Sequence, residues 1–178
     1  EIFHDFVSVP LGGKTVRKII TPNVAAQTRA HFGCNDPWEK PGLELEDQGG
    51  GGTAGSHWKK RLMGDELMTG TKSKSMPLSA LTLALLQDSG WYFVDYAASE
   101  RLPWGQDKGC AFIQESCGSA WPVPEYFCTQ VSGQGCTVDM KSRGLCALTP
   151  GGASKPSMYR YFEDPTWSGT NALLDYCP

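Results

Sequence analysis

Residues 53–70 read TAGSHWKKRLMGDELMTG, and the interpretation of the whole chain depends on this stretch. It follows a run of four glycines at 49–52 and places His57 a short distance ahead of Met68. A loop histidine followed by a core methionine has the same appearance, so the spacing alone favours no metal site. The chain has only three histidines, His4, His31 and His57, which restricts the side chains that can bind a transition metal.

The first four residues, Glu1-Ile2-Phe3-His4, match the last four positions of H-E-x-x-H. In a zinc protease helix that pattern puts two histidines one turn apart, with the glutamate between them as general base. The first histidine would be the residue immediately before Glu1. E-x-x-H alone is a weak signal, since an ordinary exposed helix terminus can carry it.

Composition limits the classes of protein that fit. The chain has 178 residues, is 40% hydrophobic, contains 21 glycines and 12 prolines, and carries a formal net charge of −3. This suits one loop-rich domain, or one domain with an appendage. The absence of a basic block argues against a nucleic-acid partner. No run of 18 apolar residues occurs, so we expect no membrane-spanning segment within these residues. No signal peptide occurs either, which in a chain that looks secreted predicts a processed product or a fragment.

Seven cysteines indicate a disulfide-bonded protein. One lies early, at Cys34, and six lie in the last third of the chain, without any C-x-x-C pair. Irregular spacing in a Gly/Pro-rich region favours disulfides and an oxidising compartment over a zinc knuckle. The odd count leaves one cysteine that is either free or paired outside this chain.

Local patterns predict several elements. We expect the end of a helix over residues 1–9, an extended segment over 14–20, and a helix from Thr21 to a terminating Gly33, with Pro22 at its first position. Residues 35–56 look like a long loop with an acidic patch at Glu44, Glu46 and Asp47. A buried helix is expected over 77–89, followed by a strand-like WYFVDY at 91–96.

Three stretches together resemble the leishmanolysin-type zinc metalloproteases of the metzincin clan. They are RAHFGC at 29–34, LELEDQGGGGTAGSHWKKRLMGDELMTG at 43–70 and LTLALLQDSGWY at 81–92, and Trp104-Gly105 agrees as well. The resemblance covers nearly the whole chain. It implies Zn²⁺ as cofactor, Glu1 as general base, His4 and His57 as zinc ligands, and Met68 as the methionine-turn residue. His31 falls outside the implied zinc site.

The resemblance also implies an architecture and a location. The fold expected is α+β, with the C-terminal part of a metzincin-like catalytic domain in residues 1–100 and a disulfide-stapled extension in 101–178. The implied disulfides are Cys34–Cys110, Cys128–Cys146 and Cys117–Cys177, which leaves Cys136 to pair beyond residue 178. The protein would act on peptide substrates at the cell surface or outside the cell, together with the remaining N-terminal part of the protease. Any membrane anchor would lie in segments outside this chain.

One position departs from the family pattern. Metzincins continue their motif as H-E-x-x-H-x-x-G, and the glycine place counted from His4 is Val7. A β-branched residue resists positive φ, so either the turn is built differently or the site is degraded. Val7 therefore supports one alternative, a catalytically inactive, secreted relative with a structural or binding role. A second alternative, which sets the resemblance aside, is a cysteine-rich extracellular adhesion domain.

Overall fold

The computed structural model describes residues 6–11, 13–35, 41–117, 126–128, 133–137, 141–146, 148–149 and 152–178. These residues form an α+β fold, as predicted. The strands are β1 (Phe6–Leu11), β2 (Lys14–Ile19), β3 (Leu43–Glu44), β4 (Gln134–Cys136), β5 (Arg143–Leu145), β6 (Leu148–Thr149) and β7 (Ser168–Gly169). The α-helices are α1 (Pro22–Phe32), α2 (Lys60–Met63), α3 (Ala80–Asp88) and α4 (Cys110–Gln114). Single 3₁₀ turns are η2 (Gly50–Gly52), η3 (Tyr96–Ala98), η5 (Ser157–Tyr159) and η6 (Ala172–Leu174).

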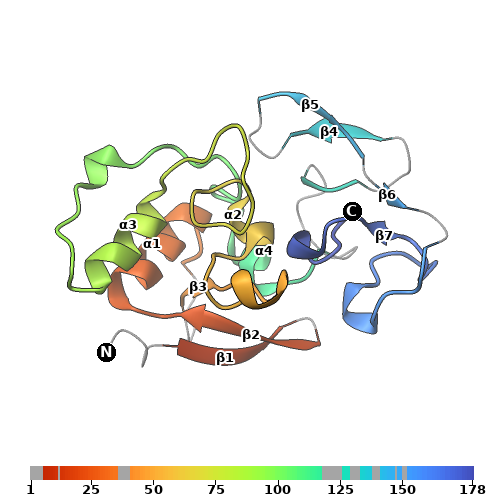
Figure 1. Cartoon of the computed structure of the whole chain (residues 1–178), viewed down its shortest axis with the longest axis horizontal. Helices are drawn as coiled ribbons and strands as arrows, with labels where there is room; N and C mark the ends of the chain where they lie inside the picture. Colours follow the sequence, from red (N-terminus) through yellow and green to blue (C-terminus); the bar gives the residue numbers. More distant parts are fainter. Residues whose placement is uncertain are drawn as a thin grey trace.

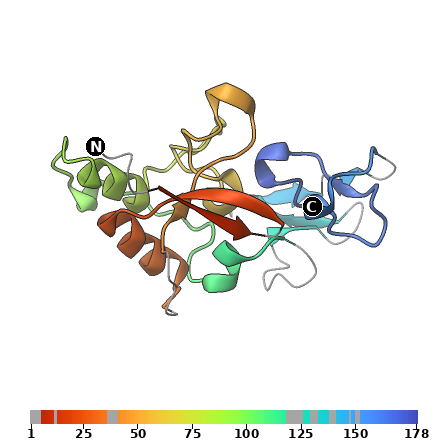
Figure 2. The same ribbon diagram turned by 90° about the horizontal axis from the view of Figure 1, so that it is seen from below.

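The two longest helices lie at one end of the molecule. Helices α1 and α3 pack side by side there, and the C-terminal segments occupy the other end (Figures 1 and 2). The β1–β2 hairpin runs along one edge, and its second strand pairs with β3 in an antiparallel sheet of order β1-β2-β3. None of the helices in the described ranges is long and apolar enough to cross a bilayer.

Strand β1 corrects the prediction of a helix end over residues 1–9. Val7 pairs with Lys18 and Val9 with Val16, so residues 6–9 are extended, whereas residues 1–5 lie outside the described part. Alternating β-branched residues favour a strand, and Gly13 supplies the positive φ of 84° that the return to β2 requires. Because Val7 sits in a regular strand, the turn of the metzincin motif is not built at this residue.

Helix α1 confirms the punctuation expected from Pro22 and Gly33. Gly33 ends it in the left-handed conformation, with φ 65°. Thr21 occupies the N-terminal cap position, but its side chain makes no capping hydrogen bond. Instead the Asp88 carboxylate, at the end of α3, accepts the backbone N–H groups of Asn23 at 2.9 Å and Val24 at 3.0 Å. A carboxylate there accepts from N–H groups that have no partner within the helix, and it complements the helix dipole. Because Asp88 belongs to α3, the same contact links the two helices.

Helix α3 begins three residues after the predicted start. Ser79 caps it by accepting the backbone N–H of Thr82, while the Pro77 carbonyl accepts the N–H of Leu67 in the preceding chain. Its first turn is buried, as expected from the leucine pattern. The strand predicted over 91–96 is wrong. Trp91 is 76% exposed and belongs to no strand, because no neighbouring segment pairs with it in the described fold.

The loop predicted over 35–56 contains regular structure in its described part. Leu43–Glu44 adds a strand to the sheet, and the glycine run forms η2. The core extends from this sheet and α1 to the C-terminal half, where Cys117 and Cys177 join it. The fold forms the three disulfides that the resemblance implied, Cys34–Cys110, Cys117–Cys177 and Cys128–Cys146. Cys136 is exposed and forms no disulfide within the described chain.

Candidate metal centre

The backbone around His57 is held on both sides by neighbouring chain segments. The His57 carbonyl accepts the N–H of Glu46 at 2.8 Å, next to a bridge between Leu45 and Trp58. On its other side, Trp58 donates its N–H to the Met68 carbonyl at 3.0 Å. The two residues that the sequence singled out, His57 and Met68, therefore lie on adjacent, directly hydrogen-bonded segments.

The His57 ring is oriented through one of its two nitrogens. Its Nδ1 lies 2.9 Å from Ser56 Oγ and 3.2 Å from the Thr53 carbonyl oxygen. A carbonyl only accepts, so the second contact favours the neutral tautomer with its proton on Nδ1 and its lone pair on Nε2. Within the described residues no hydrogen-bond partner occupies Nε2. Metal-binding histidines commonly have this arrangement, in which one nitrogen donates to a backbone carbonyl and the other is left for the metal.

Glu66, buried with 0% exposure, fixes the segment that carries Met68. Its Oε2 accepts the Met68 backbone N–H at 2.6 Å, and its Oε1 accepts the hydroxyl groups of Ser79 at 2.7 Å and Thr82 at 2.5 Å. The Trp58 indole, also fully buried, donates to the same Thr82 hydroxyl at 2.9 Å. The Met68 turn and the residue after His57 are therefore both anchored to the start of α3.

A buried group of charges lies behind the same segment. Lys59, with 0% exposure, places its ammonium 2.7 Å from Glu46 Oε1 and 2.6 Å from Asp175 Oδ1, and it also contacts Asp47. Lys14 contacts Asp47 and Asp175, both at 2.9 Å. Two residues of the acidic patch predicted in a loop, Glu46 and Asp47, are thus paired with the buried Lys59. The buried group of charges joins the chain beside His57 to the C-terminal segment, where α2 and η6 meet (Figure 1).

The ionisation of this cluster follows from its burial and its partners. Burial opposes the charged form of Lys59, but the carboxylates of Asp175, Glu46 and Asp47 outweigh it and hold the pKa of Lys59 above its ordinary value. For Asp47, burial acts to raise the pKa, but the ammonium groups of Lys59 and Lys14 lower it by more. The pKa of Asp47 therefore lies below its usual range. Lys59 and Asp47 are therefore both charged at neutral pH.

The other predicted site residues fall into two groups. Glu1 and His4 lie outside the described residues. His31 lies in the last turn of α1, and its Nε2 is 2.9 Å from the Trp104 carbonyl, so that nitrogen is already in use. Burial lowers the pKa of His31, although the Trp104 carbonyl and Asp107 act in the opposite direction. Within the part of the chain that the structure covers, no group of three His, Cys, Asp or Glu side chains is placed to hold a metal.

Two features of this region could not be read from the sequence. Glu66 is part of the DELM segment, but nothing in its spacing distinguishes it from an exposed acidic residue. Lys59 follows Trp58 directly and precedes Lys60, a pair that normally marks a solvated surface. Their burial depends on Thr82 and Asp175, which are distant in sequence.

The chain is similar in sequence to known proteins over most of its length. The family model for leishmanolysin, Peptidase M8, matches residues 4–178. The leishmanolysin-like peptidase of Drosophila melanogaster is 39% identical over 186 residues, which cover 93% of this chain and 27% of that protein. Leishmanolysin of Leishmania donovani is 39% identical over 165 residues, covering 90% of this chain and 27% of that protein. These matches place the chain in a family whose matched members are named as peptidases or as leishmanolysins.

The chain is a member of the leishmanolysin family. It spans about a quarter of the length of the curated relatives it matches, including the leishmanolysin-like peptidase of Caenorhabditis elegans, which is 36% identical over 197 residues. The division at residue 100 into a catalytic part and an extension stays a prediction. Contacts such as Lys59 to Asp175 cross that boundary.

Proposed function

We propose that this chain forms part of a zinc-dependent endopeptidase that hydrolyses peptide bonds in protein substrates. The observation that carries the proposal is the His57 ring, whose Nδ1 is engaged by the Thr53 carbonyl and whose Nε2 is left for a ligand. Membership of the leishmanolysin family supports the same activity. A histidine whose other ring nitrogen is hydrogen-bonded to a carbonyl is a suitable zinc ligand, so His57 fits the metal that the family implies.

Each site residue has a proposed role. His57 and His4 would bind the metal, together with a histidine placed immediately before Glu1. Zinc in such sites supplies Lewis-acid polarisation of the carbonyl and activation of water near neutral pH. Glu1 would accept a proton during attack on the peptide carbonyl and return it to the leaving amine.

Met68 and Glu66 are proposed as positioning residues. The carbonyl of Met68 accepts the N–H of Trp58, and its own N–H is bound by Glu66. Movement of this turn would displace the backbone next to His57, and an error of about 1 Å in a catalytic site can cost on the order of 100-fold in rate.

The proposed location is the cell surface or the extracellular space. Three disulfides suit an oxidising compartment, and the absence of a basic block gives no support to a nucleic-acid partner. Protein substrates and the N-terminal part of the protease are the partners we propose. Membrane attachment would depend on segments outside this chain.

The test compares two histidine variants of the protein. His57→Ala should lose stoichiometric zinc, measured by atomic emission, and the chelator-sensitive cleavage of a denatured protein substrate. His31→Gln is the matched control, because His31 lies outside the proposed site, and it should keep both. Wild-type zinc content and turnover in His57→Ala would refute the ligand assignment. A wild-type protein that binds no zinc would instead be the inactive relative.

A further inference from the structure

Three consecutive aromatic side chains project from the segment that follows α3. Trp91 is 76% exposed, Tyr92 is 55% exposed and Phe93, at 109%, is fully exposed. They make up three of the five large hydrophobic side chains that the described residues expose. In both views the chain between α3 and η3 forms the outer end of the described molecule (Figures 1 and 2). Single apolar residues on a surface are ordinary, but a contiguous group marks an interaction site.

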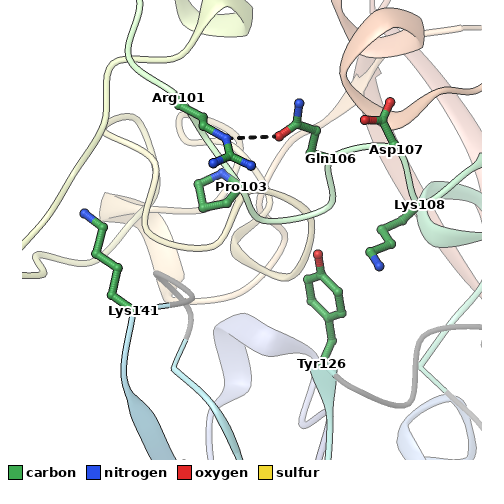
Figure 3. A pocket seen from close by; sticks show the side chains of 7 residues that line it. All are labelled: Arg101, Pro103, Gln106, Asp107, Lys108, Tyr126 and Lys141. Carbon is green, nitrogen blue, oxygen red and sulfur yellow. Dashed lines mark hydrogen bonds between the residues drawn. The ribbon is translucent and has the colours of Figure 1, made fainter.

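The segment that carries these rings is fixed at both of its ends. On one side the Asp88 carboxylate binds the first turn of α1. On the other side the Glu100 N–H donates to the Leu78 carbonyl at 2.8 Å. In the turn that follows, Arg101 Nε donates to Gln106 Oε1 at 3.4 Å (Figure 3). A segment held in this way loses little conformational entropy when a partner covers it.

The charge around the rings limits what can cover them. Residues 88–100 contain three acids, Asp88, Asp95 and Glu100, and no Lys, Arg or His. In a two-fold dimer each such patch would meet its own copy, so acids would face acids. A membrane surface with anionic lipids repels them in the same way. The partner that complements this segment therefore has an apolar hollow bordered by Lys or Arg side chains.

The size of the patch favours a partner in the same polypeptide. An aromatic side chain buries about 150–250 Å² when it is fully covered. Complete coverage of three rings therefore stays below the roughly 800 Å² per partner that a stable complex between separate proteins buries. A covalently linked partner needs less contact area, because the linker gives it a high effective concentration.

The N-terminal side of the chain joins the fold at the same end as the rings. Phe6, the first described residue, pairs with Ile19 at the end of β2. Ile19 leads into α1, whose first turn is bound by Asp88, three residues before Trp91. The polypeptide on the N-terminal side of Phe6 therefore connects to the fold close to the segment from which the rings project.

We infer that Trp91, Tyr92 and Phe93 dock on the N-terminal part of the same protease, in an apolar hollow bordered by basic side chains. This docking rests on the proposed function, which supplies that part as the polypeptide preceding Glu1, although the proposed mechanism uses none of the three rings. In the curated relatives most of the polypeptide lies outside the region that this chain matches. Because α3 also anchors the Met68 turn, the contact fixes the two parts of the proposed site relative to each other.

Photo-cross-linking in the full-length protease tests the docking directly. Phe93→p-benzoylphenylalanine places a photoreactive ring at the most exposed of the three positions, and Leu145→p-benzoylphenylalanine, at an 80% exposed residue of β5, is the matched control. Irradiation should join residue 93 to a peptide from the N-terminal side of Glu1 within one polypeptide, identified by mass spectrometry, and the control should give no such product. A product of doubled mass would assign the rings to a second copy, and an adduct with added phosphatidylcholine vesicles would assign them to a membrane. Either result, or no cross-link at all, would overturn the inference.

Substitutions measure what the contact contributes to stability. Phe93→Ser in the full-length protease should lower Tm by about 4–10 °C, as expected for the loss of a buried aromatic ring. Leu145→Ser removes an exposed apolar side chain and should change Tm by no more than about 1 °C. Equal shifts in the two variants would contradict the docking. Zinc content and cleavage are measured separately, so a protein that cross-links as expected but binds no zinc would refute the proposed function and leave the docking standing.

Discussion

Replacing Lys59 with methionine tests whether the buried charge cluster holds the region beside His57. Methionine keeps an unbranched apolar stem and removes the ammonium group. Lys59 is fully buried, and its Nζ lies 2.7 Å from Glu46 Oε1 and 2.6 Å from Asp175 Oδ1. Lys14 still reaches Asp47 and Asp175 in the variant, but Glu46 loses the cation that neutralises it.

The expected loss of stability is large. Removing one partner of a buried ion pair leaves an uncompensated charge, which costs about 3–5 kcal/mol. For a domain of this size each kcal/mol lowers Tm by about 2–4 °C, so Lys59→Met should lower Tm by about 6–20 °C. Lys72→Met, at an exposed site, should change the free energy of unfolding by no more than about 0.5 kcal/mol.

Urea unfolding followed by circular dichroism measures both variants. A double-mutant cycle with Asp175→Asn isolates the pair, because asparagine tolerates the φ of 55° at residue 175. The two substitutions should be non-additive by about 0.5–3 kcal/mol. A loss below about 1 kcal/mol for Lys59→Met, against the 3–5 kcal/mol expected, would refute the reasoning.

The same cluster predicts a dependence on acid. The folded pKa of Asp47 is depressed, so its contribution is present above its unfolded pKa of about 4 and is lost as the pH falls through the folded value. Between pH 6 and pH 2 the free energy of unfolding should therefore fall more steeply for wild type than for Asp47→Asn. Parallel curves would contradict this assignment.

Three further variants test the frame around the site. Gly105→Ala should cost about 3 kcal/mol in urea unfolding, because the residue has φ 74° and an added Cβ would lie 2.6 Å from the Phe32 ring; an unchanged midpoint would refute this. Replacing Cys34 and Cys110 together by serine removes a link across 76 residues and should cost about 4.5 kcal/mol by loop entropy; a loss under about 1 kcal/mol would contradict that account. In His31→Gln the free energy of unfolding should depend less on pH below about pH 6.5. The pKa of His31 is depressed in the folded protein, so its contribution to stability is present above that pH and is lost as the pH falls; an unchanged slope would exclude the effect.

Local signals in the sequence predicted some elements correctly. Helix α1 follows from Pro22 at its start and Gly33 at its end, because each residue has a backbone preference that acts without tertiary contacts. The leucine-rich pattern similarly predicted α3, although its start depends on the Ser79 cap rather than on Pro77. Strand β1 was missed, because a few apolar residues near the N-terminus fit a helix or a strand until β2 pairs with them.

The sequence by itself determined the α+β class, the family and the pairing of six cysteines, all three through motifs that the family shares. Tertiary structure decided the surroundings of His57. The Thr53 contact that orients its ring, the burial of Lys59 against Asp175 and the position of Glu66 beneath Met68 all depend on segments brought together by folding. A charged residue looks the same in sequence whether it is solvated or paired, because its partner, often more than a hundred positions away, sets the free energy of its burial.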